Sequence, residues 1–125
     1  MEKIVLDTSV LLSIFELKID LFEEIKKACD FRYELFIVEG TLEELERLIN
    51  GLLLSKRQAA VFAEKLLQAR HVKVLETENN GSVDDQLVDL DGYIVATADR
   101  ELKRRLKAKG TRILTIRQKK YVMLE

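Results

Sequence analysis

Carboxylate side chains are the groups in this chain whose types and spacing could do chemistry. Asp7 ends a short apolar run, KIVLD, and Glu44 lies in the segment TLEELERL. The stretch SVDDQLVDLDGYIVATADREL, residues 82–102, adds Asp84, Asp85, Asp89, Asp91 and Asp99. Carboxylates brought to one place repel each other and raise one another's pKa unless a cation is present. Mg²⁺ and Mn²⁺ are hard ions that take such oxygen ligands. The chemistry to test for is therefore that of a divalent metal site.

The elements that must position these acids alternate along the chain. Segments with apolar residues at helical spacing separate short apolar runs, which predict buried strands at 3–7, 34–38, 72–76, 93–97 and 112–116. The order βααβααβαβαβ predicts an α/β sandwich, a three-layer fold with a five-stranded, mostly parallel central sheet. The final run, KYVMLE, is a candidate edge strand. With 125 residues and no linker or repeat, the chain is expected to form a single domain, 1–125.

This topology assigns the acids to two opposite edges of the sheet. In a parallel sheet all strands end at one edge, and the helices that follow them begin there. The acids expected at that edge end a strand or open a helix, and they are Asp7, Glu44, Asp84, Asp85 and Asp99. Asp89 and Asp91 come at the other end of their helix and should face away. Five acids at one edge favour a metal site.

Ordinary helix capping is the alternative explanation for most of these acids. Acids at helix N-termini are stabilised by about 0.3–1 kcal/mol each. The pattern Thr41-x-x-Glu44 reads as a capping box, Ser82 with Asp85 reads as another, and Asp99 reads as an N-cap. Asp7 fits this explanation badly, because it closes an apolar strand. The residues alone therefore leave both explanations open.

The charge distribution points to a polyanion. The net charge is only −1, from 21 basic and 22 acidic residues. The segment 100–120 nevertheless carries ten Lys and Arg residues against one acid, Glu101. Such a segment indicates either a local contact with a polyanion or a solvated helix face.

The remaining composition excludes several classes of protein. Cys29 is the only cysteine and His71 the only histidine, so an intrachain disulfide is impossible and a zinc site is not expected. Scattered glycines argue against a P-loop or dinucleotide-binding loop. The N-terminus does not read as a signal peptide, and no apolar run approaches the length of a membrane span, so the expected location is the cytoplasm.

Four motifs in order resemble the PIN-domain ribonucleases. They are VLDTSVLL at the first strand, EELERL after the second, DDQL opening a later helix, and YIVATADRELKRRL after that. The last stretch looks most similar to small archaeal relatives of the ribosomal-RNA-processing PIN proteins, and VapC-type toxins are a looser match. The resemblance implies a five-stranded parallel sheet and a cleft of three or four acids. By position these catalytic residues are Asp7, Glu44, one or both of Asp84 and Asp85, and Asp99.

The resemblance also implies roles for the acids and their neighbours. The aspartates Asp7, Asp84, Asp85 and Asp99 would bind Mg²⁺ or Mn²⁺, with Asp84 slightly preferred over Asp85. Ser9 and Thr97 match the supporting polar positions. The basic helix would track RNA through Arg100, Lys103, Arg104, Arg105 and Lys107. One departure is Val38-Glu39-Gly40, where family members often have a proline.

The implied activity is metal-dependent hydrolysis of RNA phosphodiester bonds. Its substrate would be single-stranded RNA or a ribosomal precursor. A toxin of the VapC type, with an antitoxin partner, shares this chemistry. A non-catalytic RNA-binding module with a PIN-like fold is the alternative from another class. PIN domains often form homodimers, and no membrane contact is expected.

Overall fold

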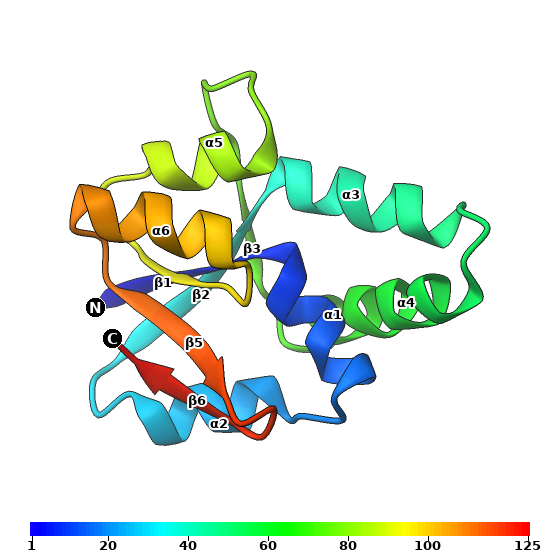
Figure 1. Cartoon of the computed structure of the whole chain (residues 1–125), viewed down its shortest axis with the longest axis horizontal. Helices are drawn as coiled ribbons and strands as arrows, with labels where there is room; N and C mark the ends of the chain where they lie inside the picture. The colour runs from blue at the N-terminus through cyan, green and yellow to red at the C-terminus, as the bar shows by residue number, and fades with distance from the viewer.

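The computed structural model describes all residues, 1–125, as alternating strands and helices around one sheet (Figure 1). The strands are β1 (Glu2–Leu6), β2 (Tyr33–Val38), β3 (Lys73–Leu75), β4 (Ile94–Ala96), β5 (Ile113–Arg117) and β6 (Tyr121–Leu124). The helices are α1 (Thr8–Glu16), α2 (Leu21–Ala28), α3 (Glu39–Ile49), α4 (Leu54–Ala69), α5 (Val83–Asp89) and α6 (Arg100–Lys109). The order of elements is the one that the sequence predicts.

The sheet has six strands in the order β3-β2-β1-β4-β5-β6. The first five are parallel, and β6 pairs antiparallel with β5. The predicted α/β fold with a mostly parallel sheet is confirmed, but the predicted five strands become six. The short connection between β5 and β6 allows only a hairpin, so the final apolar run returns along β5 as an antiparallel edge. β1 lies in the interior of the sheet, so Asp7 follows a strand with neighbours on both sides.

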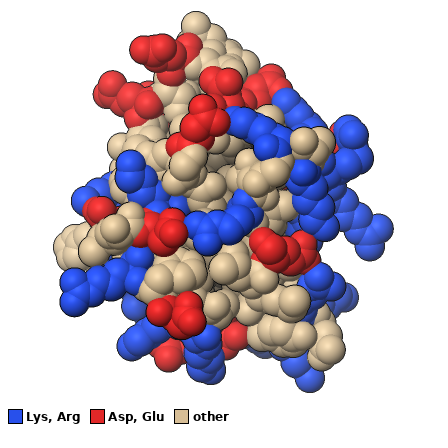
Figure 2. Space-filling model, turned by 90° about the vertical axis from the view of Figure 1, so that its left-hand side faces the viewer, with Lys and Arg blue, Asp and Glu red and all other residues tan.

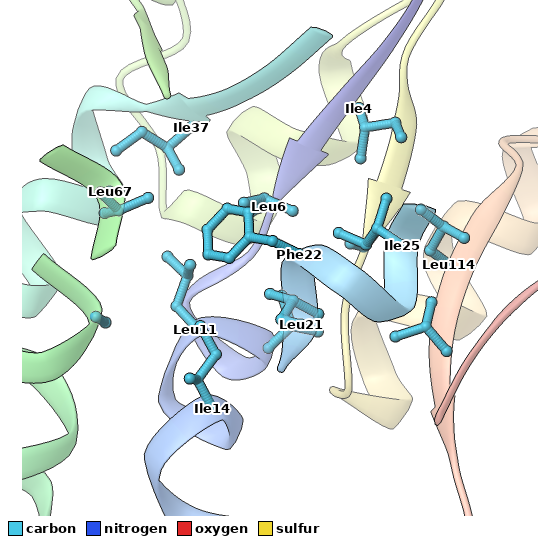
Figure 3. Packing of buried hydrophobic residues seen from close by; sticks show 14 of the residues in the cluster. Ile4, Leu6, Leu11, Ile14, Leu21, Phe22, Ile25, Ile37, Leu67 and Leu114 are labelled. Carbon is cyan, nitrogen blue, oxygen red and sulfur yellow. The ribbon is translucent and has the colours of Figure 1, made fainter. Parts of the chain in front are cut away.

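Two apolar clusters cover the two faces of the sheet. Residues of β1 alternate between them: Ile4 and Leu6 belong to the larger cluster and Val5 to the smaller one. The larger cluster takes side chains from α1, α2, α3 and α4 (Figure 3), and the smaller one takes Leu87, Leu102 and Leu106 from α5 and α6. Burying each such leucine stabilises the fold by about 1.5–3 kcal/mol. The central strand is thus held from both sides, as a buried parallel strand requires.

Helix α3 begins earlier than its sequence pattern predicts. Its first residue is Glu39, and the N-cap Val38 has no side chain that could cap it. The predicted capping box of Thr41 and Glu44 is therefore wrong: Thr41 lies inside the helix, fully buried, and its hydroxyl has no hydrogen-bond partner. Because α3 begins at Glu39, Glu44 lies beyond the capping positions of the helix and its side chain does not cap it.

Gly40 lets α5 approach the first turn of α3 closely. A Cβ atom at Gly40 would lie 2.7 Å from Cγ2 of Val83 and 3.0 Å from Oε1 of Gln86. Both distances are shorter than normal contacts, so a larger residue would push the two helices apart. The glycine therefore helps to bring Asp84, the neighbour of Val83, toward the end of β1. None of the helices has the length and apolar character needed to cross a membrane.

Candidate active site

Asp7 is buried between the ends of β1 and β4. It is the N-cap of α1 but makes no side-chain capping bond, and it is only 5% exposed. Its Oδ2 atom accepts hydrogen bonds from Ser9 Oγ at 2.6 Å and from Thr97 Oγ1 at 2.7 Å. The Asp7 amide donates to the carbonyl of Ala96 at 2.9 Å. One carboxylate oxygen is thus fixed by the protein, and Oδ1 has no protein partner.

Glu44 points from α3 toward the start of α1. Thr8 Oγ1 donates a 2.8 Å hydrogen bond to Glu44 Oε1. Burial raises the pKa of Glu44, and the charges of Asp7 and Asp84 raise it further, while the bond from Thr8 and the charge of Arg47 act in the opposite direction. Thr8 is a supporting residue that the sequence did not single out, because only its place beside Asp7 in the motif could have suggested it.

Asp84 faces the same carboxylates from the N-terminus of α5. Burial raises its pKa, and the charges of Asp7 and Asp99 add to this effect, whereas Arg105 opposes it. Neither oxygen of Asp84 accepts a hydrogen bond from the protein. An acid without partners beside other acids costs free energy in its charged form.

Asp85, the residue after Asp84, has a structural role. Its backbone amide donates to Ser82 Oγ at 3.1 Å, and its Oδ2 accepts from the Ser82 amide at 3.3 Å, which completes the predicted capping box. Its Oδ1 accepts a 2.8 Å hydrogen bond from Arg105. The hydrogen bond from Arg105 lowers the pKa of Asp85, and those from Ser82 add to this. The pKa values of the adjacent Asp84 and Asp85 are therefore shifted in opposite directions.

Asp99 caps α6 and is connected to Asp7 through shared hydroxyls. Its Oδ1 accepts from the Leu102 amide at 2.9 Å, as its predicted N-cap position requires. Its own amide donates to Thr97 Oγ1 at 3.1 Å, and the Ala98 amide donates to Ser9 Oγ at 2.9 Å. Ser9 and Thr97 therefore join the loop before α6 to Asp7.

Asp89 and Asp91 lie apart from these acids. Asp89 is the last residue of α5, at the opposite end from Asp84. Asp91 follows it and is 90% exposed, with an ion pair of 3.0 Å to Lys109 at the end of α6. Neither perturbs the pKa of Glu44 or Asp84.

The five basic residues of α6 predicted to contact RNA differ in whether an acid pairs with them. Arg104 and Arg105 are engaged by acids: Nε of Arg104 donates to Glu101 at 3.1 Å, and Arg105 pairs with Asp85. Arg100 and Lys103 form no ion pair, and Lys107 lies 3.2 Å from Glu125. The helix thus does not present all five predicted contacts equally to a ligand.

The chemistry of the four central carboxylates fits a divalent cation. In the side-chain positions of this structure, no three or more His, Cys, Asp or Glu residues lie close enough together to hold a metal ion. Asp7, Glu44 and Asp99 each have one oxygen engaged by the protein and the other without a hydrogen bond. Such bonds orient metal-binding carboxylates. Asp84 has both oxygens available.

A mainly apolar hollow lies elsewhere in the molecule. It has a volume of about 460 Å³ and is lined by residues that include Ile14, Phe15, Phe22 and Phe62. These residues sit toward the end of α1 that is remote from Asp7. The hollow has no acid other than Asp20, so we assign the chemistry to the carboxylates and not to this cavity.

Comparison with known proteins identifies the family. Residues 4–119 match the PIN-like domain family. Ribonuclease VapC4 of Methanocaldococcus jannaschii is 32% identical over 125 residues, which cover 97% of this chain and 95% of that protein. Ribonuclease VapC9 of Archaeoglobus fulgidus is 34% identical over 125 residues, which cover 97% of this chain and 87% of the relative.

Solved structures agree with these sequence matches. The PIN domain endonuclease Utp24 superposes with a TM-score of 0.78 and 26% identity, over 98% of this chain and 90% of that one. A domain of a functionally unknown protein from M. jannaschii has a TM-score of 0.61 and 18% identity, over 94% and 92%, and shares the fold. On the family match and the two ribonucleases that align over nearly its whole length, the chain belongs to the PIN-domain ribonuclease family.

Proposed function

We propose that this protein is a metal-dependent endoribonuclease that hydrolyses RNA phosphodiester bonds with Asp7, Glu44, Asp84 and Asp99. One observation carries the assignment: four carboxylates from four separate elements lie at one edge of the sheet, where burial and then the charges of Asp7 and Asp99 raise the pKa of Asp84. Capping accounts for Asp99 alone among them. Asp85, engaged by Ser82 and Arg105, is left out of the proposed ligand set.

Each residue has a defined task in this mechanism. Asp7, Asp84 and Asp99 would hold a Mg²⁺ or Mn²⁺ ion. When bound, such an ion lowers the pKa of water and offsets charge on the leaving oxygen. Ser9 and Thr97 keep Asp7 oriented, and Thr8 does the same for Glu44. Glu44, whose raised pKa makes it a better base, accepts a proton as water attacks phosphorus and the bond to the leaving oxygen breaks.

Cleavage of a labelled single-stranded RNA tests this function. Wild-type protein should cleave with Mn²⁺ or Mg²⁺ and stop when EDTA is added. Asp7→Asn should abolish cleavage, whereas Asp89→Asn, an equal charge change at the far end of α5, should leave it intact. Equal activity of the two variants would refute the assignment. Binding without cleavage under all metal conditions would favour the non-catalytic RNA-binding module.

Two cellular roles would use this same chemistry: a toxin of a toxin–antitoxin pair and a ribosomal RNA processing enzyme. Both curated relatives bear VapC names, which supports a toxin with an antitoxin partner. The stretch YIVATADRELKRRL, which resembles the ribosomal-RNA-processing PIN proteins, supports ribosomal RNA processing instead. A small antitoxin gene immediately upstream would decide for the toxin. A cytoplasmic location and a homodimer complete the proposal, and size measurement in solution tests the latter.

A further inference from the structure

The basic residues near the C-terminus concentrate on one side of α6. Arg100, Lys103 and Lys107 are spaced three and four residues apart, so they share one face of the helix. Arg104 pairs with Glu101 and Arg105 with Asp85, while Lys109 donates to the carbonyls of Val88 and Leu90, so these three residues have partners within α6 or around α5. Figure 2 shows Lys and Arg gathering at the right-hand side of the face where both termini lie.

Arg117 extends this face from the end of β5. Ile113 packs with Leu102 and Leu106 of α6, and the alternation of a strand places Thr115 and Arg117 on the same side of the sheet as Ile113. Arg117 and Lys107 both bind the carboxylate of Glu125, Lys107 at 3.2 Å. The sequence motifs that suggested RNA contacts did not include Arg117.

These four cations are closely spaced and are balanced by one acid. Partial burial lowers the pKa of Lys103, and the charges of Arg117, Lys107 and Arg100 lower it further, with Glu125 alone opposing them. Glu125 is 18% exposed at its side chain. Its pKa is lowered although burial acts against this, because the hydrogen bonds from Lys107 and Arg117 favour its charged form. Such an excess of positive charge attracts a polyanion.

The cluster starts at the carboxylate edge. Arg100 follows Asp99 directly, and Arg117 stands at the carboxyl end of β5, which neighbours β4. The turn after Arg117 has positive φ at Gln118 (53°) and Lys119 (56°), and the Lys120 amide donates to the Arg117 carbonyl at 3.0 Å. The exposed Lys119 and Lys120 therefore lie at this same edge.

We infer that Arg100, Lys103, Lys107 and Arg117 form a track for the phosphate backbone of single-stranded RNA, and that Glu125 is a counter-charge which the RNA displaces. This inference rests on the proposed ribonuclease function. It names the side of the site along which the RNA backbone runs away from the carboxylates. The track excludes Arg104 and Arg105, although both had been predicted to bind RNA.

Binding of a labelled single-stranded RNA of uniform sequence, measured by anisotropy with EDTA present, tests the track without cleavage. Arg117→Gln should weaken binding about fivefold at 0.1 M salt and lower the slope of log K against log salt by about 0.7, the effect of one lost phosphate contact. Lys109→Gln, an equal charge change on the opposite face of α6, where the side chain contacts the carbonyls of Val88 and Leu90, should leave the slope unchanged. Glu125→Gln should tighten binding severalfold.

Each outcome decides one question. Equal slopes for Arg117→Gln and Lys109→Gln, or weaker binding by Glu125→Gln with an unchanged melting temperature, would refute the track. Absence of RNA binding by the wild type would refute it as well. Binding that follows the expected pattern without any cleavage in Mn²⁺ would instead support the track and refute the proposed nuclease function. Because Arg117 is half exposed, its replacement is expected to leave folding intact, and a thermal melt checks this.

Discussion

Thr97 Oγ1 donates a 2.7 Å hydrogen bond to Asp7 Oδ2 across 90 positions of sequence. The same hydroxyl accepts a hydrogen bond from the Asp99 amide. Thr97 therefore fixes the positions of Asp7 and Asp99 relative to each other. Thr97 is fully buried, so water does not compete for these bonds. The ends of two neighbouring strands, β1 and β4, therefore fix Asp7 and Asp99 relative to each other.

Asp7→Asn should separate the electrostatic and structural roles of Asp7. The amide oxygen can accept the bonds from Ser9 and Thr97, and loss of the charge relieves repulsion with Asp84. We expect the metal-free variant to be as stable as wild type or more stable by about 1 kcal/mol. Added Mn²⁺ should raise the melting temperature of wild type and leave that of the variant unchanged. A wild type unaffected by millimolar Mn²⁺ would contradict a preformed metal site.

Asp84→Asn should stabilise the metal-free protein at neutral pH. Since burial and neighbouring acids raise the pKa of Asp84, the folded protein holds this proton more tightly than the unfolded chain. The stability contribution of Asp84 is full below its ordinary value of 3.8 and is lost as pH rises through the raised pKa. The variant should therefore gain stability over wild type above that range and match it in acid, as urea titrations in EDTA would report.

Asp85→Asn should have the opposite pH dependence. Hydrogen bonds from Arg105 and Ser82 lower the pKa of Asp85, so its contribution is present above its ordinary value and disappears as pH falls through the lowered pKa. We expect a loss of stability at neutral pH and none in strong acid. Two adjacent aspartates with the same sign of effect would contradict the orientations described for them.

Thr8→Val should impair the site and spare the fold. Valine keeps the shape of threonine but cannot donate to Glu44, and a lost bond of this kind costs about 0.5–1.5 kcal/mol. Because this bond lowers the pKa of Glu44, its removal should shift the acid limb of the cleavage profile to higher pH. Thr41→Val is the matched control: its buried hydroxyl has no partner, so we expect equal or greater stability and an unchanged pH profile.

Gly40→Ala should disturb the site from a distance. Its Cβ would meet Val83 at 2.7 Å, and overpacking of this kind costs about 1–3 kcal/mol. As α5 moves away from α3, Asp84 should leave the other acids, so cleavage should fall. Adding Val83→Ala makes room for the new methyl group and should restore much of the activity. No rescue by the second change would mean that Gly40 acts in another way.

The alternation of apolar runs predicted the α/β order, and the ends of those runs predicted which acids share an edge. This worked because strand direction in a parallel sheet fixes where the next helix begins. The side-chain orientations were less accessible. Asp84 and Asp85 occupy adjacent helical positions. The capping box with Ser82 was readable from the sequence, but the bond of Asp85 to Arg105, twenty residues onward, was not. The start of α3 was missed because Val38 has no capping side chain, whereas Thr41 suggested a later start.

The unequal packing of the elements has a consequence for how the site opens. Asp7 follows the innermost strand, whose amides should exchange with solvent only on global unfolding. Asp84 belongs to α5, seven residues long and anchored by one fully buried side chain, Leu87. Local unfolding of α5 would withdraw Asp84 while Asp7 and Asp99 keep their places. The release rate of a bound cation would then be set by the opening of this one short helix, and hydrogen exchange in α5 should slow when Mn²⁺ is added.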